Sequence, residues 1–115
     1  MNPFIAHLNA GNTLVADGAT GTNLLRMGLT SGSSPEDLVM ENPELLLKLA
    51  GSFVDAGSDI ILTCTFGGTP LRMKDSKYVD RYEEVNLRAV ELALLVRMTP
   101  QGAPQRFTRI CMTGL

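Results

Sequence analysis

Residue types with special chemistry are scarce in this chain of 115 residues. It has no tryptophan, one histidine and two cysteines, Cys64 and Cys111, which lie far apart with no second pair. A disulfide or zinc framework needs more cysteines at closer spacing, so neither is expected. A reducing compartment fits this cysteine usage best, and we expect a cytoplasmic location.

Long apolar runs and an excess of charge of one sign are also missing. No apolar run reaches roughly eighteen residues, so we expect no membrane span, and the N-terminus lacks the pattern of a secretory signal. The formal net charge of −2 gives no electrostatic basis for binding nucleic acid. The glycines match neither G-x-G-x-x-G nor the P-loop pattern, so dinucleotide and P-loop sites lack their fingerprints.

What the chain does contain is the composition of a globular protein. Hydrophobic residues make up 44% and charged residues 19%, and the length suits one domain at most. Apolar spacing and the Asn, Pro and Gly signals predict the elements. We expect a first helix from Asn2-Pro3 to Gly11, further helices at 20–27, 43–56 and 78–96, and buried strands at 13–16 and 60–62.

Strands that alternate with helices predict an α/β fold with a parallel sheet. The run from Ile60 to Leu62 has no polar alternation, which is typical of a strand buried on both faces. Residues 30–36 are interpreted as a plain connecting loop. In the last helix, Glu84 and Arg88 stand four residues apart and are expected to pair across one turn.

Residues 97–115 differ in character from the rest. Pro100, Gly102 and Pro104 prevent the preceding helix from continuing. Residues 107–115 then fit two alternatives, a third strand or a tail without a packing partner.

The first of two short motifs is residues 17–22, Asp-Gly-Ala-Thr-Gly-Thr. Asp17 ends a strand, and Gly18 would let its backbone N–H approach a ligand closely. The free N–H groups of the helix that follows favour a carboxylate. Such a tip could hold the ammonium group of an amino acid on Asp17 and its carboxylate on the amides. The alternative is that Asp17 caps the short helix and the glycines only turn the chain.

The second motif, residues 56–67, ends in Thr63, Cys64, Thr65 and Phe66. Alternate residues of a strand share a face, so Thr63 and Thr65 are expected to point the same way and could hydrogen-bond a ligand, with Phe66 as an apolar wall. The alternative is ordinary strand residues and a core aromatic. If the two strands are parallel neighbours, both motifs emerge at one sheet edge, where α/β proteins bind ligands.

Four further polar residues receive modest expectations. Cys64 is interpreted as a small core residue, and His7 as a partly exposed helix residue rather than a ligand. Asp59 is expected to serve a turn. Asn86 either bonds across to a loop backbone or faces water.

In combination the motifs resemble the start of the homocysteine S-methyltransferase family, which includes the homocysteine-binding barrels of methionine synthase and betaine–homocysteine methyltransferase. The segments that carry the resemblance run from about Thr13 to about Ala93. They are LVADGATGTNLLRMG, ENPELLLKLAGSFVDAGSDIILTCTFGGT and EEVNLRAVELA.

The resemblance implies the N-terminal portion of a (β/α)8 TIM barrel that transfers a methyl group to the thiol of homocysteine, forming methionine. It implies homocysteine and a methyl donor as small-molecule partners, and contacts of Asp17 and Gly18 with the amino-acid end. Thr63 would hydrogen-bond nearby, with Thr65 on the same face and Phe66 lining the pocket. Asn86 matches a recurring family position, with a structural role.

Two departures limit what the resemblance carries over. The family binds zinc through cysteines of later strands, and nothing in this chain matches those ligands, so no metal ligand is assigned here. The chain is also shorter than the roughly 250 residues of an eight-stranded barrel. We therefore expect residues 1–96 to be the N-terminal part of a homocysteine-binding barrel domain and 97–115 to be a divergent, truncated or disordered tail.

Three functional alternatives remain at this point. The first is a methyltransferase by descent that lacks the zinc-ligand part and does not catalyse methyl transfer alone. Its methyl donor is open, although Gly67 after Phe66 offers no aromatic ring for a quaternary ammonium and so disfavours betaine. The second is a non-catalytic fragment that pairs with a complementary chain, through an exposed sheet edge. The third is an unrelated α/β enzyme that binds another small acid.

Overall fold

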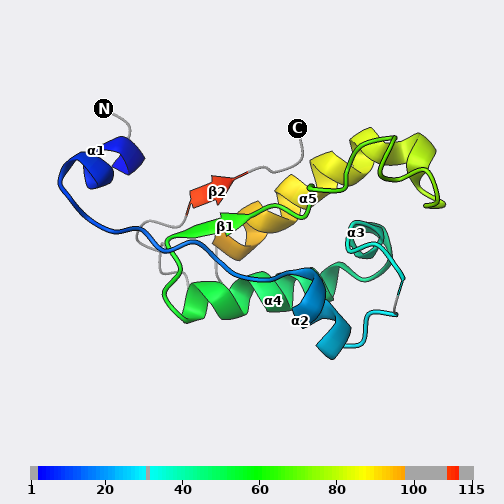
Figure 1. The fold of residues 1–115 in the computed structure, drawn as a ribbon, viewed down its shortest axis with the longest axis horizontal. Coiled ribbons are helices and arrows are strands. Elements are labelled where there is room, and N and C mark those ends of the chain that lie inside the picture. The colour runs from blue at the N-terminus through cyan, green and yellow to red at the C-terminus, as the bar shows by residue number, and fades with distance from the viewer. Residues whose placement is uncertain (1–2, 31, 98–108, 112–115) are drawn as a thin grey trace.

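The computed structural model describes residues 3–30, 32–97 and 109–111. Short helices precede a helix–strand–helix–strand succession (Figure 1). The predicted alternation of helices with parallel strands is confirmed from α4 onward. The elements in chain order are α1 (Pro3–Asn9), α2 (Gly21–Arg26), α3 (Asp37–Glu41), α4 (Pro43–Asp55), β1 (Ile60–Leu62), the 3-10 turn η1 (Val79–Arg81), α5 (Tyr82–Arg97) and β2 (Arg109–Cys111).

The two strands β1 and β2 form a parallel pair. Ile60 lies opposite Arg109, and Ile61 lies opposite Ile110. Of the two alternatives for the C-terminal region, the third strand is confirmed for residues 109–111. Because α5 lies between the two strands in the chain, β1, α5 and β2 form a β-α-β unit of the kind that parallel pairing requires.

A second segment runs along the other edge of β1. Ala16 makes one parallel bridge with Ile60. The N–H of Ile60 donates to the carbonyl of Val15 at 3.1 Å, and the N–H of Asp17 donates to the carbonyl of Ile60 at 2.9 Å. The expectation of a buried strand at 13–16 is wrong in extent and burial, since only one bridge forms and the side chain of Val15 is 53% exposed. Among the described residues, this segment pairs only with β1.

Burial of β1 is one-sided. Ile61 is completely buried, whereas Leu62 is 37% exposed. The prediction that the strand is buried on both faces is therefore wrong. The physical reason is that Ile61 packs with Val54 of α4 and with residues of α5 in the second core cluster, whereas Leu62 lies on the wall of two cavities.

Helix α4 is the central packing element. Pro43 stands in its first turn, where a missing N–H costs nothing, and Gly57 ends the helical segment with φ +104°, a conformation that side chains disfavour. Figure 1 shows α4 and α5 running beside the strand pair, with α2 and α3 against the other end of α4. The main core cluster comprises Leu24, Leu38, Val39, Leu46, Leu49, Met73, Val85 and Ala89, and a second cluster comprises Val54, Ile61, Ala93 and Val96.

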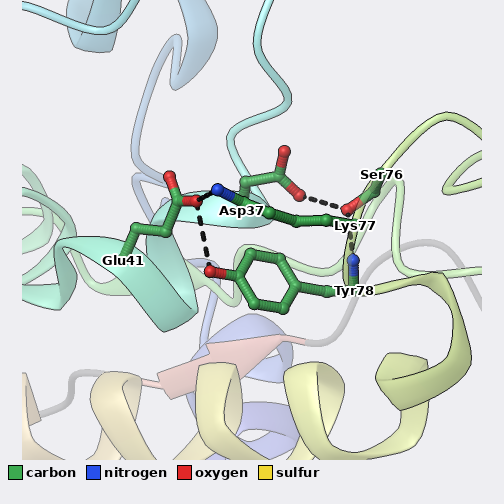
Figure 2. Close-up of polar contacts among 5 residues, drawn as sticks. All are labelled: Asp37, Glu41, Ser76, Lys77 and Tyr78. Carbon is green, nitrogen blue, oxygen red and sulfur yellow. Dashed lines mark hydrogen bonds and ion pairs between the residues drawn. The ribbon is translucent and has the colours of Figure 1, made fainter.

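Helix α3 has no counterpart in the sequence prediction. Five residues are too few for a helical period to show, yet Leu38 and Val39 enter the core. Its polar side meets the loop before η1, as Figure 2 shows: the Ser76 hydroxyl donates to Asp37 at 2.5 Å. The Tyr78 hydroxyl donates to Glu41 at 3.1 Å, and Lys77 forms an ion pair with the same carboxylate.

The final helix begins later than predicted. Residues 79–81 form the 3-10 turn, and α5 proper starts at Tyr82. Glu84 pairs with Arg81 rather than with the expected Arg88: the Arg81 guanidinium donates two hydrogen bonds of 2.8 Å to its carboxylate. The planar guanidinium fork favours this two-bond geometry. In the described part of the chain, no helix is both long and apolar enough to cross a bilayer.

Candidate functional site at the strand tips

Asp17 ties the two strand tips together. The N–H of Leu62 donates to its Oδ2 at 3.1 Å. Main-chain pairing along this edge of β1 ends at Ile60. The carboxylate therefore accepts the next N–H on this edge, that of Leu62, in place of a main-chain carbonyl. The alternative role as a helix cap is wrong, because Thr20 is the N-cap residue of α2 and no side chain caps that helix.

The second carboxylate oxygen of Asp17 is buried and unsatisfied. Oδ1 is shielded from solvent and has no hydrogen-bond partner among the described residues. Burial raises the pKa of Asp17 above its ordinary value of 3.8, while hydrogen bonds from Leu62 and from its own backbone N–H pull the pKa down. A buried carboxylate oxygen without a partner is costly, so a cationic or donor group placed against it would be stabilised.

Gly18 packs closely against the side chain of Phe53. A Cβ at this position would lie 3.2 Å from Cε1 of Phe53, which belongs to α4. A larger residue at 18 would need the ring to move by a few tenths of an ångström. The ring of Phe53 also lines the cavity beside Asp17.

Thr63 and Thr65 follow β1, and both are buried. Their hydroxyl oxygens lie 2.7 Å apart, which confirms that the two side chains point the same way. The N–H of Thr65 also donates to the carbonyl of Thr63 at 2.9 Å, so a tight turn replaces the predicted continuation of the strand.

Two adjoining cavities open at these tips. A small one of about 40 Å³ is lined by Asp17 and otherwise largely by apolar side chains of α4 and α5. A larger one of about 470 Å³, here called the tip cavity, shares four lining residues with it, so the two are neighbours. The tip cavity is lined by Thr20, Gly21, Ser34, Pro35, Glu36, Leu62, Thr63, Cys64, Phe66, Gly67 and Arg72.

Phe66 forms part of the wall of the tip cavity, as the expected role requires, although its side chain is 61% exposed. The guanidinium of Arg72 lies over the ring at 4.6 Å from its centroid. This cation–π contact brings a positive charge to a cavity that also contains the carboxylate of Glu36.

Sequence reasoning missed Glu36, which it assigned to a plain connector. Glu36 is only 6% exposed. Its Oε1 accepts the N–H of Gly67 at 2.7 Å, and its Oε2 accepts the hydroxyl of Ser34 at 2.5 Å. The only local signal is a pair of acidic residues, Glu36 and Asp37, before an apolar run, and such residues are ordinarily solvated.

Asn86 bonds across to the loop backbone, the first of its two predicted alternatives. Its Nδ2 donates to the carbonyl of Gly68 at 2.6 Å and to that of Tyr82 at 2.8 Å. Its Oδ1 is buried without a partner among the described residues. His7 is half-buried next to Asn12, as expected of a partly exposed helix residue. The carboxylate of Asp59 does more than serve the expected turn, since it accepts the N–H of the distant Val15 at 2.9 Å.

Cys64 is a poor candidate for a metal ligand or nucleophile. Burial, assisted by the charge of Glu36, raises the pKa of its thiol to about 12, and thiolates are the form that binds zinc. Within residues 3–30, 32–97 and 109–111, no group of three His, Cys, Asp or Glu residues could hold a metal ion. The described residues therefore do not fit the zinc that the family resemblance implies.

The predicted site residues thus lie around one end of β1, but they do not all line the same cavity. Asp17 lines the small cavity, Phe66 lines the tip cavity, and Thr63 lines both. Gly18 and Thr65 line neither of these two cavities. They contact lining residues instead: Gly18 lies against Phe53, and the Thr65 hydroxyl lies beside that of Thr63.

Comparison with known proteins places the chain among methyltransferases of homocysteine. The model of a family described as Homocysteine S-methyltransferase matches residues 14–112. The match continues past Ala93, where the resemblance was expected to end, and includes β2. The division at residue 96 stays a prediction.

Two individual proteins are similar to most of the chain. S-methylmethionine–homocysteine S-methyltransferase BHMT2 of Rattus norvegicus is 30% identical over 97% of this chain and 29% of its own length. The crystal structure of the homocysteine methyltransferase MmuM from Escherichia coli, oxidised form, matches 99% of this chain and 40% of its own, with a TM-score of 0.77 and 24% identity. The chain therefore spans less than half the length of either relative.

Proposed function

Because this chain belongs to the homocysteine S-methyltransferase family, we propose that it forms the part of a methyltransferase that holds the amino-acid end of homocysteine. The observation that carries this proposal is the buried, unpartnered Oδ1 of Asp17 at the joined strand tips. An ammonium group would satisfy that oxygen and relieve the cost of its burial.

The remaining site residues have complementary roles in this proposal. Thr63 and Thr65 form a hydroxyl pair beside the cavities, and Gly18 gives Phe53 the room to pack behind Asp17. Phe66 supplies an apolar wall for the carbon chain of the substrate. The tip cavity then leaves space for a methyl donor next to the thiol.

We infer that the chain is the N-terminal portion of a (β/α)8 barrel, in which β1 and β2 are neighbouring strands. The TM-score of 0.77 over 40% of MmuM supports this inference. In the full family the methyl acceptor is a zinc-bound thiolate, and zinc makes the sulfur nucleophilic. The described residues do not fit that ion, so we propose that this chain alone binds homocysteine and does not transfer the methyl group. A cytoplasmic location, where the thiol stays reduced, suits this role.

Calorimetric titration of the chain with L-homocysteine tests the binding role. We expect Asp17→Asn to weaken binding about tenfold or more, since a hydrogen bond to a charged group contributes about 1.5–3 kcal/mol. The analogue without the amino group, 4-mercaptobutyrate, should bind equally weakly to both forms. Asp55→Asn, the same change at an exposed position of α4, is the matched control and should bind like the parent chain.

The pH dependence gives an independent check with a definite sign. Only the ionised carboxylate attracts an ammonium group, and the pKa of Asp17 is raised above 3.8. As the pH is lowered, the affinity for homocysteine should therefore begin to fall while the pH is still above 3.8. Unchanged homocysteine affinity in Asp17→Asn would contradict the proposal. So would an analogue that binds the parent chain as tightly as homocysteine does.

A further inference from the structure

Residues 66–68, here called the glycine turn, lead the chain away from the tip of β1. The N–H of Gly68 donates to the carbonyl of Thr65 at 2.9 Å, which closes the turn. Apart from this bond, the turn is held by side chains that come from two different helical regions. Neither side chain belongs to the five predicted site residues.

Glu36, directly before α3, holds the turn from one side. Its Oε1 accepts the N–H of Gly67 at 2.7 Å, a short distance typical of a charge-assisted hydrogen bond. Ser34 donates to Oε2 at 2.5 Å and so fixes the orientation of the carboxylate. A Cβ at position 67 would lie 3.0 Å from the carboxylate, so any other residue here would crowd Glu36.

Asn86, in α5, holds the turn from the other side. Its Nδ2 donates to the carbonyl of Gly68 at 2.6 Å. A second bond from the same nitrogen to the carbonyl of Tyr82, one helical turn earlier, fixes the amide on its own helix. The side chain also fills the place where a Cβ of residue 68 would stand.

Phe66 is the residue next to this double attachment. It precedes the two held peptide groups directly, its ring stacks with the guanidinium of Arg72, and it lines the tip cavity. We propose that Glu36 and Asn86 are positioning residues of the substrate site, which hold the glycine turn so that Phe66 keeps its place on the wall of the tip cavity. The inference rests on the proposed function for the identity of the substrate, and on the contacts alone for the positioning.

Nuclear magnetic resonance of the ¹⁵N-labelled chain tests the positioning without any ligand. In the parent chain the Gly67 amide proton should resonate downfield, and the Phe66 ring should show cross-relaxation with Arg72. Glu36→Ala and Asn86→Asp should lose the ring contact, and Glu36→Ala should also shift the Gly67 proton upfield. Glu36→Gln retains an acceptor oxygen and should restore the contact, and Glu91→Gln, an exposed control in α5, should change neither signal.

Homocysteine titration of the same variants tests the consequence for binding. We expect about tenfold weaker binding in Glu36→Ala and Asn86→Asp, and a change within about threefold in Glu36→Gln. Ser34→Ala removes the orienting bond to Oε2 and the acceptor of the Glu36 N–H, but it keeps the carboxylate of Glu36, so it should have an intermediate effect. It replaces Glu36→Ala in the test if that variant does not fold.

The outcomes separate this inference from the proposed function. The positioning role is overturned if the Phe66–Arg72 contact survives in Glu36→Ala. If that variant does not fold, survival of the contact in both Ser34→Ala and Asn86→Asp overturns it. So does parent-like homocysteine affinity in these variants. If the parent chain binds no homocysteine, the proposed function fails, while the ligand-free resonances still decide whether Glu36 and Asn86 hold Phe66 in place.

Discussion

At the strand tips, individual side chains form hydrogen bonds with main-chain groups that have no partner in the short sheet. Asp17 accepts the N–H of Leu62, Glu36 accepts that of Gly67, and Asn86 donates to the carbonyl of Gly68. Each bond joins positions far apart in the sequence. The site is therefore built from local charges on loops that a packed scaffold brings together, as is common in α/β proteins.

Cys64 gives a prediction at this residue scale. Because the pKa of its thiol is about 12 against an ordinary 9.0, its thiolate fraction at pH 8 is lower by roughly a thousandfold. In a Cys111→Ser background, alkylation by iodoacetamide should be slower than that of a free thiol by at least about a hundredfold. The urea-unfolded chain is the positive control, and labelling of the folded chain at the free rate would contradict the prediction. Since the folded pKa is raised, ionisation favours unfolding, and stability should fall as the pH rises above 9.0.

At the scale of elements, the short helices α2 and α3 are held by one and two buried residues, respectively. Leu24 is the buried residue of α2, and Leu38 and Val39 anchor α3. The exposed polar contacts of Figure 2 add little energy, because ion pairs in water contribute weakly. Packing rather than helix propensity therefore places the loops that carry Thr20 and Glu36.

Truncation of the α2 anchor tests this view. Leu24→Ala removes a fully buried side chain from the main core cluster and should lower the free energy of unfolding by about 2–5 kcal/mol. Leu25→Ala makes the same change at the adjacent, 50% exposed position and should have a much smaller effect. Urea denaturation followed by circular dichroism measures both, and equal losses would show that α2 is not anchored through Leu24.

At the scale of the whole molecule, the sheet is narrow and its apolar surface is partly open. The segment around Ala16 pairs with β1 along one edge only, within the described residues, and Val15 is exposed beside it. An uncovered edge with apolar side chains offers hydrogen-bonding groups to another chain. This is the expectation of association through the sheet edge, and it stays a prediction.

Light scattering during gel filtration tests the association. The purified chain should show a mass above 12.4 kDa that rises with concentration. Val15→Lys should shift the chain toward the monomer, since lysine at an edge opposes pairing. Leu87→Lys, at an exposed apolar position of α5, is the matched control and should leave the mass unchanged. An unchanged mass in Val15→Lys would exclude this edge as the contact.

Much of the local structure could be read from the chain itself. Pro43 and Gly57 bound α4 as predicted, because a missing N–H and a positive φ are properties of those residues alone. The direction shared by Thr63 and Thr65 also followed from spacing. The helix α3 and the pairing of Glu84 with Arg81 could not be predicted, since five residues show no period and several partners lie within reach of one glutamate.

By itself, the sequence determined the helices other than α3, the strand β1 and the family, because periodicity, turn residues and motif combinations are carried by neighbours along the chain. Only the tertiary structure decided that Asp17 bonds Leu62 rather than a helix end, and that Glu36 reaches Gly67. Those contacts span tens of residues and depend on how α3, α4 and α5 pack. Burial then decided the charge properties of the site, since it raises the pKa of Asp17 and of Cys64.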